Sequence, residues 1–143
     1  MSTKKSPKLK AVDKTQLDAL ARFRRSLREV LADSEEICIA HELTAQRFQA
    51  LLAIENAGEP ISVGDLASDL ILKHHSAVEL ADRLAQAKMV ERLADKQDKR
   101  RVLLRLTPLG AQRLHGAAAA HLESLERLRE TLTASLQSLT VAD

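Results

Sequence analysis

Apolar residues recur at helical spacing in two short runs near the middle of the chain. The first run comprises Leu66, Ala67 and Leu70, and the second comprises Ala77, Leu80, Ala81 and Leu84. Ser62 with Asp65 three residues later is the signature of a capping box, which predicts that the first helix begins near Val63. Two helices joined by a few residues are typical of a helix-turn-helix, whose second member is the recognition helix.

The hydrophobic period changes after these two helices. Residues 89–93 and 101–106 are short aliphatic segments, and in the second one Val102, Leu104 and Leu106 alternate with Arg101, Leu103 and Arg105. An alternation of period two is typical of strands. The two segments are therefore expected to form a β-hairpin with one face on the core.

A long amphipathic helix is predicted on the N-terminal side, from about Lys14 to Ala32, and the pattern weakens from Asp33 to Leu43. Thr44 is a suitable N-cap for a further helix that runs to residue 55 or 56, where Gly58 stops it. This helix is expected to pack under the helix-turn-helix.

Another long helix is predicted after the hairpin. Thr107 suits its N-cap and Pro108 its first position, and it should continue past Gly116, with Thr131 or Thr133 ending it or capping a last short helix. It carries a stripe of Leu122, Leu125, Leu128 and Leu132. Because little chain remains to cover this stripe, it predicts a partner subunit; the alternative is that the stripe folds back on its own domain.

Together these elements predict a mainly α fold with a small β-hairpin wing. The winged helix-turn-helix core would be flanked by N- and C-terminal dimerisation helices. The expected organisation is a disordered basic tail at residues 1–13, an N-terminal dimerisation helix and connection at 14–43, a winged helix-turn-helix lobe at 44–106, and C-terminal dimerisation helices at 107–143.

The positions of the charged residues indicate a binding partner more clearly than the net charge does. The formal net charge is only +2, yet seven basic residues lie between Lys88 and Arg105 against three acids. The basic residues are Lys88, Arg92, Lys96, Lys99, Arg100, Arg101 and Arg105. Cations on a protruding loop can approach phosphates and reach into a minor groove, which indicates double-stranded DNA as the partner.

The same segment carries a family resemblance. Val90-Glu91-Arg92, Asp95, Asp98-Lys99-Arg100 and the LTPLG run at 106–110 match the pattern VERxxDxxDxRxxxLxLTxxG, so the chain resembles the winged-helix core of the MarR (multiple antibiotic resistance regulator) family. It departs from the family at two positions. Glu79 stands where the family often has a neutral or basic residue, and Lys88 replaces the usual glycine after the recognition helix.

The resemblance implies a homodimeric repressor that binds a pseudo-palindromic operator and is released by a small anionic or phenolic ligand between the dimer helices and the DNA-binding lobe. It also implies that Asp98 orients Arg100 through an ion pair and that Arg100, at the wing tip, enters the minor groove. Two alternatives remain. One is a DNA-binding dimer without a small-molecule effector, acting as an architectural or constitutive regulator, and the other is a protein-interaction module built on the terminal helices.

The candidate DNA contacts lie on the recognition helix and the wing. They are Lys73, His74, His75, Ser76, Glu79, Arg83, Lys99, Arg100 and Arg101. His74, His75 and Ser76 can hydrogen-bond to base edges in the major groove, and cationic side chains can bind phosphates. The alternative for the three polar residues is that they are exposed and have no role.

Cys38 is the single cysteine, which excludes an intramolecular disulfide and fits a reducing cytoplasm. Its neighbours Ile37 and Ile39 favour a buried thiol with a raised pKa and low reactivity. A redox sensor is the alternative, because some members of the resembling family sense hydroperoxides through a cysteine. Those proteins activate the thiolate with tyrosines, and this chain has none.

Other chemistry is disfavoured. Candidate zinc ligands are His41, Glu42, His115 and His121, but no histidine pair lies at i, i+4, so no metal or other cofactor is expected. His41 and His115 are expected to form hydrogen bonds instead. No nucleophile and base stand at a recognisable spacing, so an enzyme is not expected. No apolar run approaches the roughly 20 residues of a membrane span, and we expect a soluble cytoplasmic protein.

Overall fold

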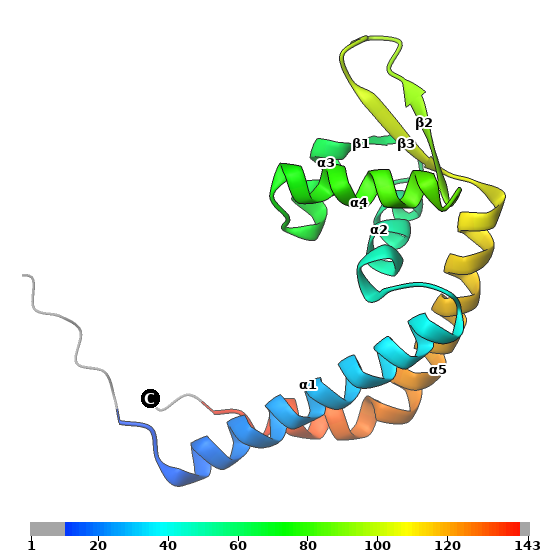
Figure 1. Cartoon of the computed structure of the whole chain (residues 1–143). Coiled ribbons are helices and arrows are strands. Elements are labelled where there is room, and N and C mark those ends of the chain that lie inside the picture. The colour runs from blue at the N-terminus through cyan, green and yellow to red at the C-terminus, as the bar shows by residue number, and fades with distance from the viewer. Residues whose placement is uncertain (1–10, 141–143) are drawn as a thin grey trace, which may run out of the picture. The chain divides into compact units, whose positions relative to one another are not determined.

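The computed structural model of the protein describes residues 11–140, so most of the tail expected to be disordered lies outside the described residues. Its elements are α1 (Lys14–Ala40), α2 (Ala45–Asn56), β1 (Ile61–Ser62), α3 (Val63–Leu70), α4 (His74–Gln86), β2 (Val90–Ala94), β3 (Val102–Leu106) and α5 (Pro108–Gln137) (Figure 1). This is the predicted mainly α fold with a small sheet. Two compact units result: the helical unit, residues 11–32 with 124–140, and the winged-helix unit, residues 33–123.

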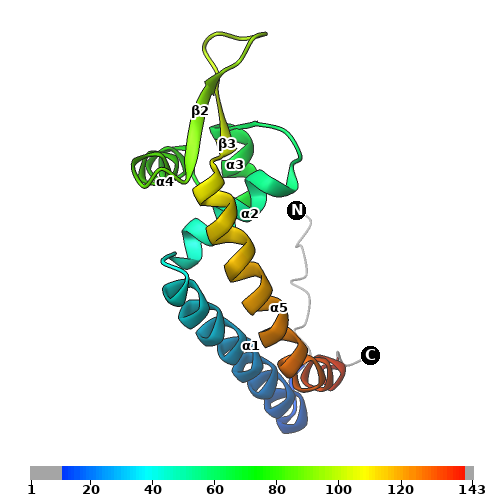
Figure 2. The ribbon, with the colours of Figure 1, turned by 90° about the vertical axis from the view of Figure 1, so that its right-hand side faces the viewer.

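The helical unit consists of the first part of α1 and the last part of α5, which lie side by side (Figures 1 and 2). Asp13 and Gln16 form reciprocal side-chain to backbone hydrogen bonds at the start of α1, with Gln16 N donating to Asp13 Oδ1 at 2.8 Å. Gln16 Nε2 also donates to the carbonyl of Thr140 at 3.3 Å. Ser26 and Ser135 are buried, and side chains of this size let two helices approach closely.

Two predicted helix ends are wrong. Helix α1 continues past Ala32 to Ala40, because Cys38 packs in the winged-helix core and keeps the last turns of the helix in place. The helix ends where Glu42 adopts φ 58. Helix α5 runs without a break to Gln137, so neither predicted threonine ends it.

The helix-turn-helix is confirmed in detail. Ser62 Oγ accepts from Asp65 N at 3.1 Å while the Asp65 carboxylate accepts from Ser62 N at 3.2 Å, which completes the predicted capping box of α3. The predicted inner face of α4 is buried, and its members are Ala77, Leu80, Ala81 and Leu84. Thr44 caps α2 as expected, with its hydroxyl accepting from Arg47 N at 3.1 Å.

The predicted hairpin of β2 and β3 is also confirmed, and we call it, with the loop at residues 95–101, the wing. It extends away from α3 and α4 (Figure 2). The sequence missed a third strand: β1 pairs antiparallel with β3, so the sheet order is β1-β3-β2. Leu104, at the middle of β3, pairs with both Ile61 and Arg92 and is fully buried, which ties the wing to the hydrophobic core of the unit.

The LTPLG run forms the corner between the wing and α5. Thr107 Oγ1 donates to the carbonyl of Lys88 at 2.6 Å and accepts from Gly110 N at 3.1 Å, which makes it the predicted N-cap. A Cβ at Gly110 would lie 2.0 Å from the carbonyl oxygen of Met89, so only glycine fits there. The motif therefore fixes the start of α5 against the end of α4.

Candidate nucleic-acid interface

Helix α4 presents a polar face opposite its buried stripe. The exposed residues on and just before it include Lys73, His74, His75, Val78, Glu79 and Arg83, while Ser76 is half-buried. Lys73 is the N-cap residue, but its side chain makes no capping hydrogen bond. Val78, which the sequence analysis did not single out, adds an apolar contact surface of the kind that meets a thymine methyl group.

Asp82, also on this face, forms an ion pair with Arg92 of β2. The pair connects the recognition helix to the wing. It also neutralises one of the two acids on the exposed face of α4, which leaves the Glu79 carboxylate as the remaining negative charge there.

Arg100 is the most exposed charged group of the wing ion pairs, with 92% of its side chain accessible. Its Nε lies 3.5 Å from Asp98 Oδ1, and the same oxygen accepts from Arg100 N at 3.0 Å. Asp98 therefore holds both the backbone and the side chain of Arg100 within the loop. The exposed guanidinium can extend into a groove of DNA while the Arg100 backbone stays bonded to Asp98.

The other arginines of the wing are bound more closely to the protein. Arg105 Nε donates to Glu91 Oε1 at 2.7 Å across the hairpin. Arg101 lies between Asp65 of α3 and Asp95 of the wing, at 3.5 Å and 3.9 Å. Among the basic residues from Lys88 to Arg105, all of which the structure describes, Lys88, Lys96 and Lys99 form no ion pair, so these lysines are the basic residues of this segment most available to phosphates.

A hollow of about 380 Å³ lies between the wing, the start of α3 and α4. It brings together His74, Arg100 and Arg101 of the candidate contacts, and its apolar walls are Val63, Val78 and Val102. The remaining candidates do not line it. Lys73, His75, Glu79 and Arg83 lie elsewhere on or beside the exposed face of α4, Ser76 is half-buried on the same helix, and Lys99 lies on the wing loop.

The other residues considered for chemistry lie inside the winged-helix unit. Cys38 is buried, as predicted, and burial raises the pKa of its thiol; a hydrogen bond with Ser34 acts in the opposite direction, and nearby Glu35 raises it further. His121, rather than His41 or His115, makes the hydrogen bonds: Nε2 lies 2.8 Å from Ser34 Oγ and Nδ1 lies 2.7 Å from the carbonyl of Ala117.

The carbonyl of Ala117 can only accept, so Nδ1 of His121 carries a proton. The imidazole also stacks on Phe48, with ring centroids 4.2 Å apart. His121 therefore joins α1, α2 and α5 within the unit. No group of three or more metal-ligating side chains lies together in the described part of the chain.

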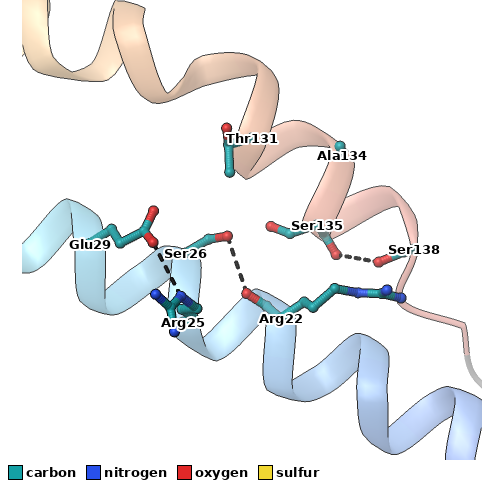
Figure 3. Close-up of a pocket in the computed structure, with 8 residues that line it drawn as sticks. All are labelled: Arg22, Arg25, Ser26, Glu29, Thr131, Ala134, Ser135 and Ser138. Atoms are coloured by element: carbon teal, nitrogen blue, oxygen red, sulfur yellow. Dashed lines mark hydrogen bonds and ion pairs between the residues drawn. The ribbon is translucent and has the colours of Figure 1, made fainter.

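A second hollow, of about 440 Å³, lies in the helical unit between α1 and α5 (Figure 3). Ser26 and Ser135 face each other across it. Both hydroxyls donate to carbonyls of their own helices, and Arg25 pairs with Glu29 at 3.4 Å. The side chains of Ser26, Ser135, Arg25 and Glu29 are thus engaged with the protein itself, and none of the residues that line this hollow is a candidate DNA contact.

Comparison with known proteins agrees with this geometry. Residues 41–101 match the family model described as MarR family. An uncharacterized HTH-type transcriptional regulator, YsmB of Bacillus subtilis (strain 168), is 26% identical over 121 residues, which cover 82% of this chain and 82% of that protein.

Two solved structures have the same fold. Wild-type apo MarR from E. coli is 25% identical, with a TM-score of 0.68 over 92% of this chain and 96% of the other. A variant of S. aureus MepR bound to an oligodeoxyribonucleotide is 20% identical, with a TM-score of 0.66 over 85% of this chain and 97% of the other. The matched residues contain the capping box, the recognition helix and the wing acids, and over this part the chain is similar to the MarR family of winged helix-turn-helix transcriptional regulators.

Proposed function

We propose that the protein is a homodimeric, sequence-specific regulator that binds a pseudo-palindromic operator in double-stranded DNA in the cytoplasm. The observation that carries the proposal is the pairing of an exposed polar face on α4 with an arginine at the wing tip that is 92% accessible. The match of residues 41–101 to the MarR family model and the DNA-bound structure of MepR, which has the same fold, support it.

Helix α4 and the wing have separate roles in this proposal. His74, His75 and Ser76 at the start of α4 contact base edges in the major groove, where Glu79 can accept from a cytosine amino group. Arg100 enters the flanking minor groove, and Lys73, Arg83 and Lys99 bind phosphates. Two recognition helices related by a two-fold axis would then read half-sites about one helical turn apart.

Dimerisation is supported by apolar side chains that the described chain leaves uncovered. On α1 these are Leu17, Leu20 and Leu31, and on α5 they are Leu122, Leu125 and Leu136; each is 42% or more exposed. Leucines at helical spacing on two long helices are suited to a partner's helices. Full burial of an exposed leucine is worth roughly 1.5–3 kcal/mol, and each of these leucines, already partly covered, would contribute about half of that.

The resemblance to the MarR family also indicates how DNA binding is regulated. We propose a repressor whose DNA affinity is lowered by a small anionic or phenolic ligand, and such a ligand can act only if it binds one spacing of the recognition helices more tightly than another. A dimer without an effector is the second candidate, and a protein-interaction module is the third. Redox sensing through Cys38 is disfavoured, because the thiol is 1% exposed and its pKa is raised by burial.

The test is Arg100→Ala. We expect the substitution to weaken binding to a defined operator about five- to 160-fold, which corresponds to the loss of a groove contact worth roughly 1–3 kcal/mol, while the dimer mass measured by sedimentation stays the same. Arg129→Ala is the matched control, since it removes an exposed arginine of α5 that pairs with Glu126 at 2.7 Å. Equal affinities for wild type and Arg100→Ala would remove Arg100 from the interface.

A further inference from the structure

We infer that Arg101 is a positioning residue, which holds the wing in place for Arg100 and does not itself bind DNA; the inference rests on the proposed DNA-binding function. The two arginines are neighbours in sequence but differ in their surroundings. Arg100 is 92% exposed and pairs with Asp98, two residues before it. Arg101 is 48% exposed and has a carboxylate on each side.

The two carboxylates come from different elements. Arg101 Nη2 lies 3.5 Å from Asp65 Oδ2, in the first turn of α3, and its Nε lies 3.9 Å from Asp95 Oδ2, at the start of the wing loop. We call these three residues the Arg101 cluster. The guanidinium presents several donors in one plane, so a single side chain can contact both acids.

Both acids are themselves held in place. Asp65 Oδ2 accepts from Ser62 N at 3.2 Å as part of the capping box. The Asp95 side chain is only 16% exposed, and its Oδ1 accepts from Gln97 N at 2.9 Å. The Arg101 cluster therefore joins a fixed point on the helix-turn-helix to a fixed point on the wing.

The backbone places Arg101 where it controls the loop. Its carbonyl accepts from Asp95 N at 3.2 Å, and its N–H donates to the carbonyl of Asp98 at 3.0 Å, so Arg101 closes the loop that carries Lys99 and Arg100. A side chain that holds this closing residue against α3 limits the directions in which Arg100 can point.

Electrostatics favours this role over a phosphate contact. If Arg101 turned toward DNA, Asp65 and Asp95 would lose their cation at a surface that faces phosphates, and like charges would repel. Arg100 would not leave an acid of another element without its cation, because its partner Asp98 lies in the same loop. The two arginines thus divide the tasks of contact and position.

Asp65→Asn gives the sharpest test, because the amide oxygen can still accept from Ser62 N while the charge is lost. If Arg101 positions the wing, the variant should bind the operator about three- to fivefold more weakly, the range that an exposed ion pair permits, although it removes a negative charge from the DNA-facing surface. If Arg101 binds a phosphate, the variant should bind as tightly as wild type or more tightly, and the inference is overturned.

Two further readouts separate positioning from general loss of structure. In the Arg100→Ala background, Asp65→Asn should have little further effect, because there is no Arg100 left to position. Equal weakening in both backgrounds would contradict the inference. Arg101→Ala should leave the slope of log affinity against log salt unchanged, whereas loss of a phosphate contact would reduce the slope by about one unit and overturn it.

The outcome for the wild type distinguishes this inference from the proposed function. If wild-type protein binds no duplex, the proposed function is wrong and the inference falls with it. If wild type binds an operator and Asp65→Asn binds it equally well, only the inference is wrong.

Discussion

At Cys38, the surroundings of one side chain decide its chemistry. The thiol is 1% exposed in the core of the winged-helix unit, next to Ser34. Its pKa is raised, chiefly by burial, so the thiol stays protonated at neutral pH. The flanking isoleucines allowed burial to be predicted from the sequence, whereas the contact with Ser34 became visible only in the fold.

Cys38 should therefore react slowly with an aromatic disulfide reagent in the native protein. At pH 8 we expect the rate to be at least about tenfold lower than in denaturant, since only the thiolate reacts and it is buried. Because the unfolded thiol loses its proton near pH 8.5 and the folded one at higher pH, this group should lower stability as pH rises above about 8.5. Rapid native-state labelling would instead support a redox sensor.

At the scale of the element, three helices are followed within two residues by a non-glycine residue in the left-handed region. Glu42, Ile71 and Lys88 have φ of 58, 55 and 60. In each case the next residue donates back to the helix, with distances of 2.8 Å for Leu43 to Cys38, 2.9 Å for Leu72 to Ala67 and 3.0 Å for Met89 to Leu84. These bonds satisfy carbonyls at the helix ends and compensate for the conformational cost.

Ile71 is the least favourable of the three, because it is β-branched and 93% exposed. Ile71→Gly should raise the free energy of unfolding by about 1 kcal/mol, since glycine removes the strain and little burial is lost. Thermal or denaturant unfolding measures this change. Val78→Gly, in the regular part of α4, is the control and should lower stability; a loss of stability in Ile71→Gly would contradict the account.

The elements differ in how far the sequence could predict them. The capping box of Ser62 and Asp65 and the buried stripe of α4 are local signals, and both were predicted at the correct residues. Strand β1 has only two residues and exists because Ile61 pairs with Leu104, a contact far apart in sequence. The partners of Arg101 were missed for the same reason, since its neighbour Asp65 belongs to α3.

At the scale of the whole molecule, a family fold, a wing with an exposed arginine and two helices with uncovered leucines support one account. The resemblance to the MarR family was predictable from the motif between Val90 and Gly110, and the structure explains why the motif ends in glycine, because the carbonyl of Met89 leaves no space for a side chain. The identity of an operator and of an effector would depend on contacts with other molecules, which no pattern within one chain specifies.

Whether the protein is a sequence-specific DNA-binding dimer can be measured by selection. The protein is incubated with a pool of random-sequence duplexes at low and at physiological salt, and the bound duplexes are sequenced. The account predicts an inverted repeat with half-sites about 10 base pairs apart that persists at the higher salt, because base contacts add to the phosphate contacts. Binding that enriches no sequence and disappears as salt rises would contradict it.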